Sequence, residues 1–141
     1  MDKKADHQGG CLCGAVRYRV EGAMRPVIAC HCSQCRRATG SFMMASAAMH
    51  DHLTIEGAEN ITWYNSSDTA RRGFCRICGS NLFWEGAGRP HTSITAGSLD
   101  GPTGLSLGRH IFVADKGDYY EIADNVAQSQ TFEGYDPTPP K

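Results

Sequence analysis

The chain has 141 residues and a formal net charge of −1, with 14 Lys and Arg against 15 Asp and Glu. This length suits a single domain with a real hydrophobic core and is too short for two domains. The near-neutral charge makes nucleic acid an unexpected partner, because such binders usually carry a strongly basic surface. No apolar run approaches the roughly 18–20 residues that cross a bilayer, so no membrane partner is expected.

Cysteine content is the most informative feature of the composition. The first ten residues, MDKKADHQGG, contain no apolar signal-peptide core, so we expect a cytoplasmic protein with reduced thiols. Seven cysteines in that compartment call for an explanation other than a disulfide scaffold. They fall into three clusters, with the spacings Cys11-x-Cys13, Cys30-x-Cys32-x2-Cys35 and Cys75-x2-Cys78.

The sequence predicts a mainly β fold, a single domain of many short antiparallel strands. Residues 1–9 are expected to form a flexible leader. Residues 15–20 alternate apolar and polar side chains, as a half-buried strand does. Similar short patterns, bounded by turn residues, predict strands at residues 26–29, 42–48, 52–55, 61–64, 69–74, 80–85, 91–96 and 109–113, with a late edge element at 119–122.

A short helical turn is expected after the second cysteine cluster, capped by Ser33 and closed by Gly40. From residue 124 the sequence is polar and ends in a proline-rich stretch, which predicts an extended tail. The chain is therefore divided into a leader (1–9), a β domain (10–123) and a tail (124–141).

Four cysteines in two pairs make a complete tetrahedral zinc site. In an extended chain Cys11 and Cys13 point to the same side, because side chains repeat every second residue, and Cys75 and Cys78 converge in a turn. We interpret these four as a structural zinc site that clips the first strand to a distant hairpin. The alternative is a set of separate reduced thiols in the core.

The remaining cysteines, Cys30, Cys32 and Cys35, supply three ligands where a closed site needs four. Three protein ligands and one open position are typical of catalytic zinc. Such a metal activates a substrate thiolate or polarises an oxygen. We therefore expect two zinc ions per chain, one structural and one catalytic.

Several residues near this segment are candidates for supporting roles. His31, Arg36 and Arg37 are close enough in sequence to offset the negative charge of three thiolates or to hydrogen-bond to sulfur. His31 is the candidate for moving a proton. The alternative is a closed site in which His31 or a distant histidine is the fourth ligand. Two further alternatives stay open: Arg71 and Arg72 either hold a substrate carboxylate or form a solvated strand face, and His110 is either an acid–base group or a packed structural histidine.

Five stretches carry a resemblance to a known family: residues 10–14 (GCLCG), 30–40 (CHCSQCRRATG), 74–80 (FCRICGS), 97–100 (GSLD) and 110–116 (HIFVADK). In them the chain resembles the glutathione-dependent formaldehyde-activating enzyme family, which also includes centromere protein V. The resemblance implies an all-β fold like that of the Mss4-type zinc proteins, a structural zinc on Cys11, Cys13, Cys75 and Cys78, and a catalytic zinc on Cys30, Cys32 and Cys35.

The activity that the resemblance implies is a carbon–sulfur lyase, which joins a thiol such as glutathione to formaldehyde or splits the S-hydroxymethyl adduct. On this hypothesis the open zinc holds the substrate sulfur or aldehyde oxygen. The partner is then a small thiol or thiol–aldehyde adduct. The rival hypothesis is a non-enzymatic zinc module that binds a protein or nucleic acid. The sequence leaves the oligomeric state open.

Overall fold

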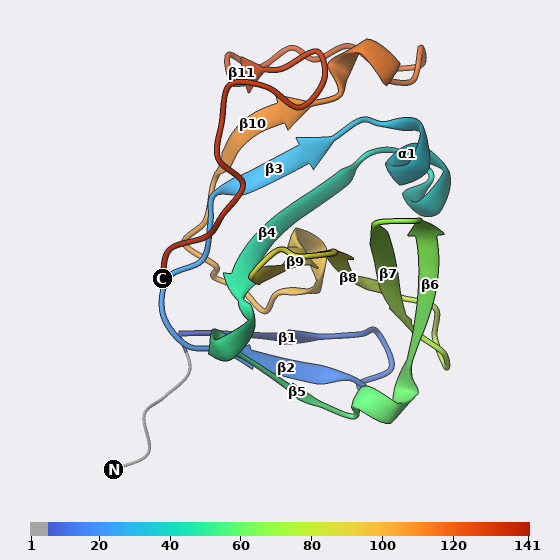
Figure 1. The fold of residues 1–141 in the computed structure, drawn as a ribbon, viewed down its shortest axis with the longest axis vertical. Helices are drawn as coiled ribbons and strands as arrows, with labels where there is room; N and C mark the ends of the chain where they lie inside the picture. Colours follow the sequence, from blue (N-terminus) through green and yellow to red (C-terminus); the bar gives the residue numbers. More distant parts are fainter. Residues whose placement is uncertain (1–5) are drawn as a thin grey trace.

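The computed structural model describes residues 6–141 and shows a single β domain with two sheets (Figure 1). The smaller sheet has the order β1–β2–β5 and contains β1 (His7–Gly10), β2 (Arg17–Val20) and β5 (Leu53–Glu56). The strands of the larger sheet are β3 (Val27–Cys30), β4 (Met43–Met49), β6 (Ile61–Ser67), β7 (Ala70–Cys75), β8 (Asn81–Gly86), β9 (His91–Thr95), β10 (Leu107–Ile111) and β11 (Ala127–Gln128). Its order is β11–β10–β3–β4–β9–β8–β7–β6.

The predicted mainly β, single-domain fold is confirmed. The strands predicted between residues 15 and 113 are all present, with ends shifted by at most three residues. The prediction of antiparallel pairing holds for most pairs, but β10 runs parallel to both β3 and β11. Pairing direction depends on which distant strands meet, and a local hydrophobic pattern does not contain that information.

Strand β4 shows how composition suits position in the sheet. It pairs with β3 on one side and β9 on the other, and its residues 45–48, Ala-Ser-Ala-Ala, are all buried. Small side chains fit because structure covers both faces of this central strand. Without a clear alternating pattern, the sequence of β4 resembles a short helix as much as a strand.

One α-helix, α1 (Ser33–Thr39), lies within the described residues, together with the 3-10 helices η1 (His50–His52), η2 (Ala58–Asn60), η3 (Ala96–Ser98) and η4 (Val113–Asp115). The expected Gly40 terminus of α1 is present, in the left-handed conformation with φ 86°. The N-cap, however, is Cys32 and not Ser33, because the Cys32 sulfur accepts a hydrogen bond from the Cys35 amide. No helix in the described part of the chain has the length and hydropathy of a membrane span.

The main core lies between the two sheets. Tyr18 and Val20 of β2 are buried against Leu82, Phe83 and Ile94 of β8 and β9. The ring of Tyr18 meets that of Phe83 edge-on at 5.5 Å between centroids. Its hydroxyl is 2.6 Å from the Ser98 hydroxyl, so the phenol keeps a polar partner although it is buried.

Both ends of the chain differ from the predicted boundaries. Residues 7–10, expected partly as a flexible leader, form β1, which pairs with β2 in antiparallel register. The first five residues of that predicted leader lie outside the described part. The expected edge element at 119–122 is not a strand, and the predicted tail instead contributes β11 and folds back over the domain (Figure 1). Ser129 and Pro139 of this tail are buried, so the domain does not end at residue 123.

Candidate active site

Four cysteines from the two distant pairs meet at one point. The sulfurs of Cys11, Cys13, Cys75 and Cys78 all lie within 4.8 Å of one another. The Cys11–Cys13 and Cys13–Cys75 sulfur distances are 3.7 and 3.8 Å. Four sulfurs about 2.3 Å from a central zinc lie about 3.8 Å apart in a tetrahedron. The spacing therefore fits a tetrahedral zinc and is far longer than the roughly 2.05 Å of a disulfide.

Backbone and hydroxyl donors surround these sulfurs. The Val16 amide donates to the Cys11 sulfur at 3.3 Å, and the Ile77 amide donates to Cys75 at 3.4 Å. The Ser80 hydroxyl is 3.2 Å from the Cys78 sulfur, and this contact, together with backbone hydrogen bonds from Ser80 and Cys13, lowers the pKa of the Cys78 thiol to about 5. Donors of this kind stabilise thiolates and orient them, as expected around a metal site.

The second cluster forms where β3 ends and α1 begins. Cys30 is the last residue of β3, Cys32 caps α1, and Cys35 lies in the first turn of the helix. Their three sulfurs lie within 4.8 Å of one another, and within residues 6–141 no fourth cysteine, histidine or carboxylate joins them. A hydrogen bond from the Cys30 thiol lowers the pKa of the Cys32 thiol, so the group favours a thiolate.

His31 does not face this cluster, which overturns both roles considered for it. The side chain is buried on the other side of the extended segment, where its Nε2 lies 2.9 Å from Nδ1 of His110 and its Nδ1 contacts the Tyr120 hydroxyl. It is not among the residues that line the cavity described below. Because alternate side chains of an extended chain point in opposite directions, His31 is directed away when Cys30 and Cys32 converge. It is therefore neither the proton carrier nor a fourth ligand in this geometry.

The histidines form a hydrogen-bonded chain that ends at a carboxylate. Asp124 accepts from His110 Nε2 at 3.0 Å, so His110 Nδ1 is left to accept from His31 Nε2, and His31 Nδ1 to accept from Tyr120. Burial lowers the pKa of His31 to about 4, which keeps its imidazole neutral. Of the two readings of His110, the packed structural one is supported. These hydrogen bonds hold His31, and with it the backbone between Cys30 and Cys32, in place.

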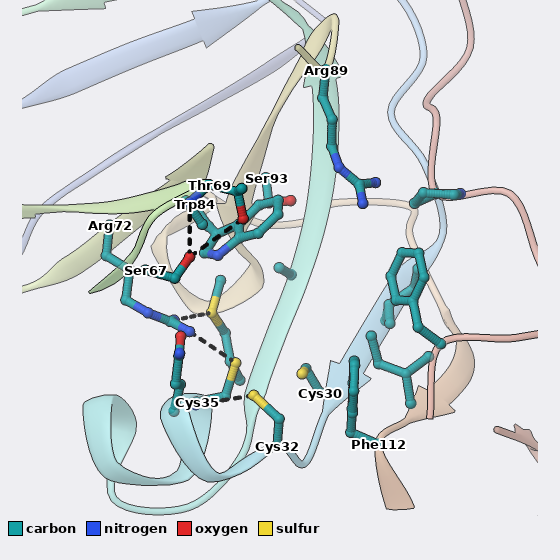
Figure 2. Close-up of a pocket in the computed structure, with 18 of the residues that line it drawn as sticks. Cys30, Cys32, Cys35, Ser67, Thr69, Arg72, Trp84, Arg89, Ser93 and Phe112 are labelled. Atoms are coloured by element: carbon teal, nitrogen blue, oxygen red, sulfur yellow. Dashed lines mark hydrogen bonds between the residues drawn. The ribbon is translucent and has the colours of Figure 1, made fainter. Parts of the chain in front are cut away.

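The three cysteines lie at one end of a cavity of about 420 Å³ (Figure 2). Apolar side chains of Met43, Ala45 and Trp84 line the cavity and pack with the three cysteines. Charged side chains lining the cavity are Arg25, Arg72, Arg89 and Asp115. This end of the domain can thus hold a small molecule in contact with the cysteine cluster.

Arg72 supplies the positive charge beside the cluster. Its Nη2 donates to the Cys35 sulfur at 3.4 Å and its Nη1 to the Met43 sulfur at 3.5 Å (Figure 2). Neighbouring Arg71 points to the other face of β7, where it binds Glu85 at 2.7 Å and covers Trp63. The expected side-chain hydrogen bond to a sulfur of this cluster thus comes from Arg72, on a strand distant in sequence, and not from Arg36, Arg37 or His31.

Replacing Arg72 with glutamine is expected to weaken zinc binding at the three-cysteine cluster by about tenfold or more. The reason is the loss of a charge-assisted hydrogen bond that offsets thiolate charge. Competition with a chromogenic chelator measures this affinity. Arg71→Gln, the same change one residue away on the opposite face, is the control, and equal affinities in the two variants would contradict the assignment.

Sequence reasoning missed most of the cavity wall. Trp84 and Arg89 lie in the β8–β9 hairpin, and Phe132 and Tyr135 lie in the tail. Neither segment carries a metal-ligand motif that would mark it as part of a site. For Arg72, the sequence indicated a possible site residue only through the pair of adjacent arginines that it forms with Arg71. Phe112 also lines the cavity and is the one described non-glycine residue with positive φ, at 54°. Such a backbone conformation in a bulky residue marks sites that the surrounding structure holds in place.

Together these features define a class: a small β protein with one closed and one open cysteine centre, the open one facing a ligand cavity. Residues 6–115 match the glutathione-dependent formaldehyde-activating enzyme family, and the chain belongs to that family.

Two curated relatives and one solved structure are similar to the chain over most of its length. The chain is 30% identical over 141 aligned residues to a Halomonas elongata protein provisionally named a glutathione-dependent formaldehyde-activating enzyme, covering 91% of this chain and 87% of that protein. It is 28% identical to an uncharacterised lyase of Schizosaccharomyces pombe, covering 86% and 89%. A crystal structure of a Rhodobacter sphaeroides protein is similar at 33% identity with a TM-score of 0.58, covering 71% of this chain and 97% of that one. The prediction of family is confirmed, and the family and the names of the two curated relatives support an enzyme.

Proposed function

We propose that this chain is a zinc-dependent carbon–sulfur lyase that forms or splits the adduct of a small thiol with formaldehyde, the thiol being glutathione or a similar molecule. The observation that carries the proposal is a cluster of three cysteines facing a cavity of about 420 Å³, with no fourth ligand within residues 6–141. A non-enzymatic zinc module needs no such cavity beside an open centre. The four-cysteine site is then structural, with Cys11, Cys13, Cys75 and Cys78 as ligands.

The donor set suits zinc, because thiolates at these distances are ligands that it favours. Bound by Cys30, Cys32 and Cys35, zinc would supply affinity for the substrate sulfur or aldehyde oxygen at its open position. In the splitting direction the carbon–sulfur bond breaks, the sulfur keeps the electron pair, and the hydroxyl proton leaves to water as the carbonyl forms.

The residues of the chain position and shield this reaction. Arg72 holds a positive charge against Cys35, where negative charge accumulates as the substrate sulfur leaves as a thiolate. Met43 and Trp84 exclude bulk water from the sulfur end, which strengthens these electrostatic interactions. The His31–His110–Asp124 chain keeps the cysteine segment rigid from behind.

Exchange spectroscopy on glutathione and ¹³C-formaldehyde tests this function. The rate of interconversion between free thiol and S-hydroxymethyl adduct should rise in proportion to the concentration of protein carrying two zinc ions, above the spontaneous rate. The same protein stripped by a chelator serves as the control. An unchanged rate with both centres loaded would reject the proposed reaction.

A further inference from the structure

The C-terminal strap, residues 129–137, forms a wall of the cavity at some distance from the cysteines. Its first residue is held by the β10 strand, since the Ser129 amide donates to the His110 carbonyl at 2.8 Å and Arg109 donates to the Ser129 hydroxyl at 3.0 Å. The Ser129 hydroxyl in turn donates to the Glu133 carbonyl. The start of the strap is therefore fixed in place and continuous with the larger sheet.

A buried arginine holds the other end of the strap. Arg25 is 8% exposed and donates from Nη1 to the Pro137 carbonyl at 2.8 Å and from Nη2 to the Ala45 carbonyl at 3.1 Å. It thus joins the strap to the central strand β4. Burial and the nearby charge of Arg89 help to lower the pKa of Arg25 to about 10. The strap is anchored at both ends, so its side chains are a built part of the cavity.

Between these anchors the strap places an aromatic cluster against the cavity. Phe132, Tyr135 and Pro137 all line it. The ring of Phe132 lies 5.1 Å from that of Tyr135 and 6.2 Å from that of Phe112. The match to the family ends at residue 115. The sulfur end of the cavity is thus built from family-matched residues, and this wall is built from residues beyond them.

Arg89 extends into the same part of the cavity. Figure 2 shows its side chain reaching toward the cavity from the end opposite Cys30, Cys32 and Cys35. Its guanidinium lies 5.3 Å from the Phe132 ring and 5.8 Å from the Trp84 ring, and no hydrogen bond or salt bridge within residues 6–141 occupies its side-chain donors. A guanidinium held between aromatic rings with its N–H groups free suits bidentate binding of a carboxylate.

The charges around the cavity favour an anion at this end. Arg72 donates a hydrogen bond to the Cys35 sulfur, and both Nη atoms of Arg25 donate to carbonyls. Arg89 is the arginine left over, and Asp115 is the single carboxylate among the described lining residues. A ligand whose sulfur reaches the cysteines while a carboxylate reaches Arg89 would satisfy both ends of the cavity.

We propose that Arg89 and the C-terminal strap form a second subsite, which selects thiols or thiol adducts that carry a carboxylate remote from the sulfur. Arg89 binds the carboxylate, and Phe132 holds the guanidinium and packs along the substrate. This inference rests on the proposed function, because that function is what places the substrate sulfur at the three cysteines. It makes the strap the specificity-determining part of the chain.

Calorimetry with S-methylglutathione and its diethyl ester tests the subsite independently of the reaction, because the methylated sulfur cannot form the formaldehyde adduct. Arg89→Gln should weaken binding of the acid by about tenfold or more and change binding of the ester by less than about twofold. Arg71→Gln, which removes a charge outside this cavity, should leave both affinities unchanged. Zinc content and melting temperature confirm that the variants are folded.

A second variant tests the strap itself. Phe132→Ala should weaken acid binding by about threefold, because the cation–π contact that holds the guanidinium is lost, and should leave zinc content intact. The proposed subsite is overturned if the wild-type protein binds the acid and the ester equally or binds neither. It is also overturned if Arg89→Gln binds the acid as tightly as the wild type does. Failure of the lyase reaction shows instead in the exchange rate of the wild type with glutathione and formaldehyde, so the two failures are distinct.

Discussion

Replacing Cys75 with serine is expected to leave the chain unfolded under conditions in which the wild-type protein is folded. Cys75 is fully buried at the end of β7, and its sulfur lies 3.8 Å from that of Cys13, 62 positions earlier in the chain. A metal that joins these residues closes a long loop. By analogy with a disulfide, closing a loop of this length stabilises the fold by about 4 kcal/mol.

The free energy lost with the zinc site is comparable with the stability of the whole domain. Structural zinc sites in small domains contribute on the order of 10 kcal/mol, while a domain is stable by about 5–15 kcal/mol in total. Serine is a poor zinc ligand, and it would place an additional hydroxyl in the core between the sheets. We expect loss of near-ultraviolet circular dichroism and of the cooperative thermal transition, with zinc content falling at both centres because the chain no longer folds.

Leu12→Ser is the matched control for this variant. Leu12 lies between Cys11 and Cys13 in the same loop, but its side chain is 89% exposed. The Leu12→Ser protein should therefore have a melting temperature within a few degrees of that of the wild type. A Cys75→Ser protein that melts cooperatively near the wild-type temperature would show that the four-cysteine site is not what holds β7 to the start of the chain.

The division of the cysteines into four and three was available from sequence, and the reason is geometric. Each pair is so closely spaced that its two sulfurs must lie near each other, and such pairs are typical of metal sites. The expected extended conformation of Cys11 and Cys13 is wrong, however, because both lie in the turn that follows β1, where the Gly14 amide donates to the Cys11 carbonyl. Several of the strands, such as β2, could be predicted because alternating apolar and polar side chains indicate a half-buried strand. The sequence interpretation treated Arg71 and Arg72 alike, although neighbouring residues of a strand point to opposite faces, and no local pattern says which face meets the second cysteine cluster.

What sequence did not reveal depends on contacts between distant segments. The parallel pairing of β3 with β10 brings Ile111 beside Cys30, and no local pattern encodes that partnership. The tail looked like an extended polar segment because Phe132 and Tyr135 follow no regular period. Its place is set by Arg25, whose partners Ala45 and Pro137 lie 20 and 112 positions away. His31 was misassigned because nearness to the cysteines in sequence was taken for nearness in space.

Replacing Cys32 with serine is expected to abolish activity and leave the fold intact, the opposite balance from Cys75→Ser. Cys32 is the N-cap of α1, where its sulfur accepts from the Cys35 amide at 3.3 Å. Serine is among the best N-cap residues, so the helix keeps its start when the sulfur is replaced by a hydroxyl. The second cluster also joins residues only five positions apart, so its loss opens no long loop.

The same change removes one of three ligands from the open centre. Altering a hydrogen-bond partner of a metal ligand costs 10- to 100-fold in affinity or activity, so losing the ligand itself should lower the exchange rate by at least about a hundredfold. Zinc content should fall from two ions per chain to one, and the melting temperature should stay within a few degrees of wild type. Arg37→Gln, an exposed change on the same helix, should keep both zinc ions and full activity. If Cys32→Ser unfolds as Cys75→Ser is expected to, the three-cysteine centre is a second structural clip and the cavity beside it is not where the chemistry occurs.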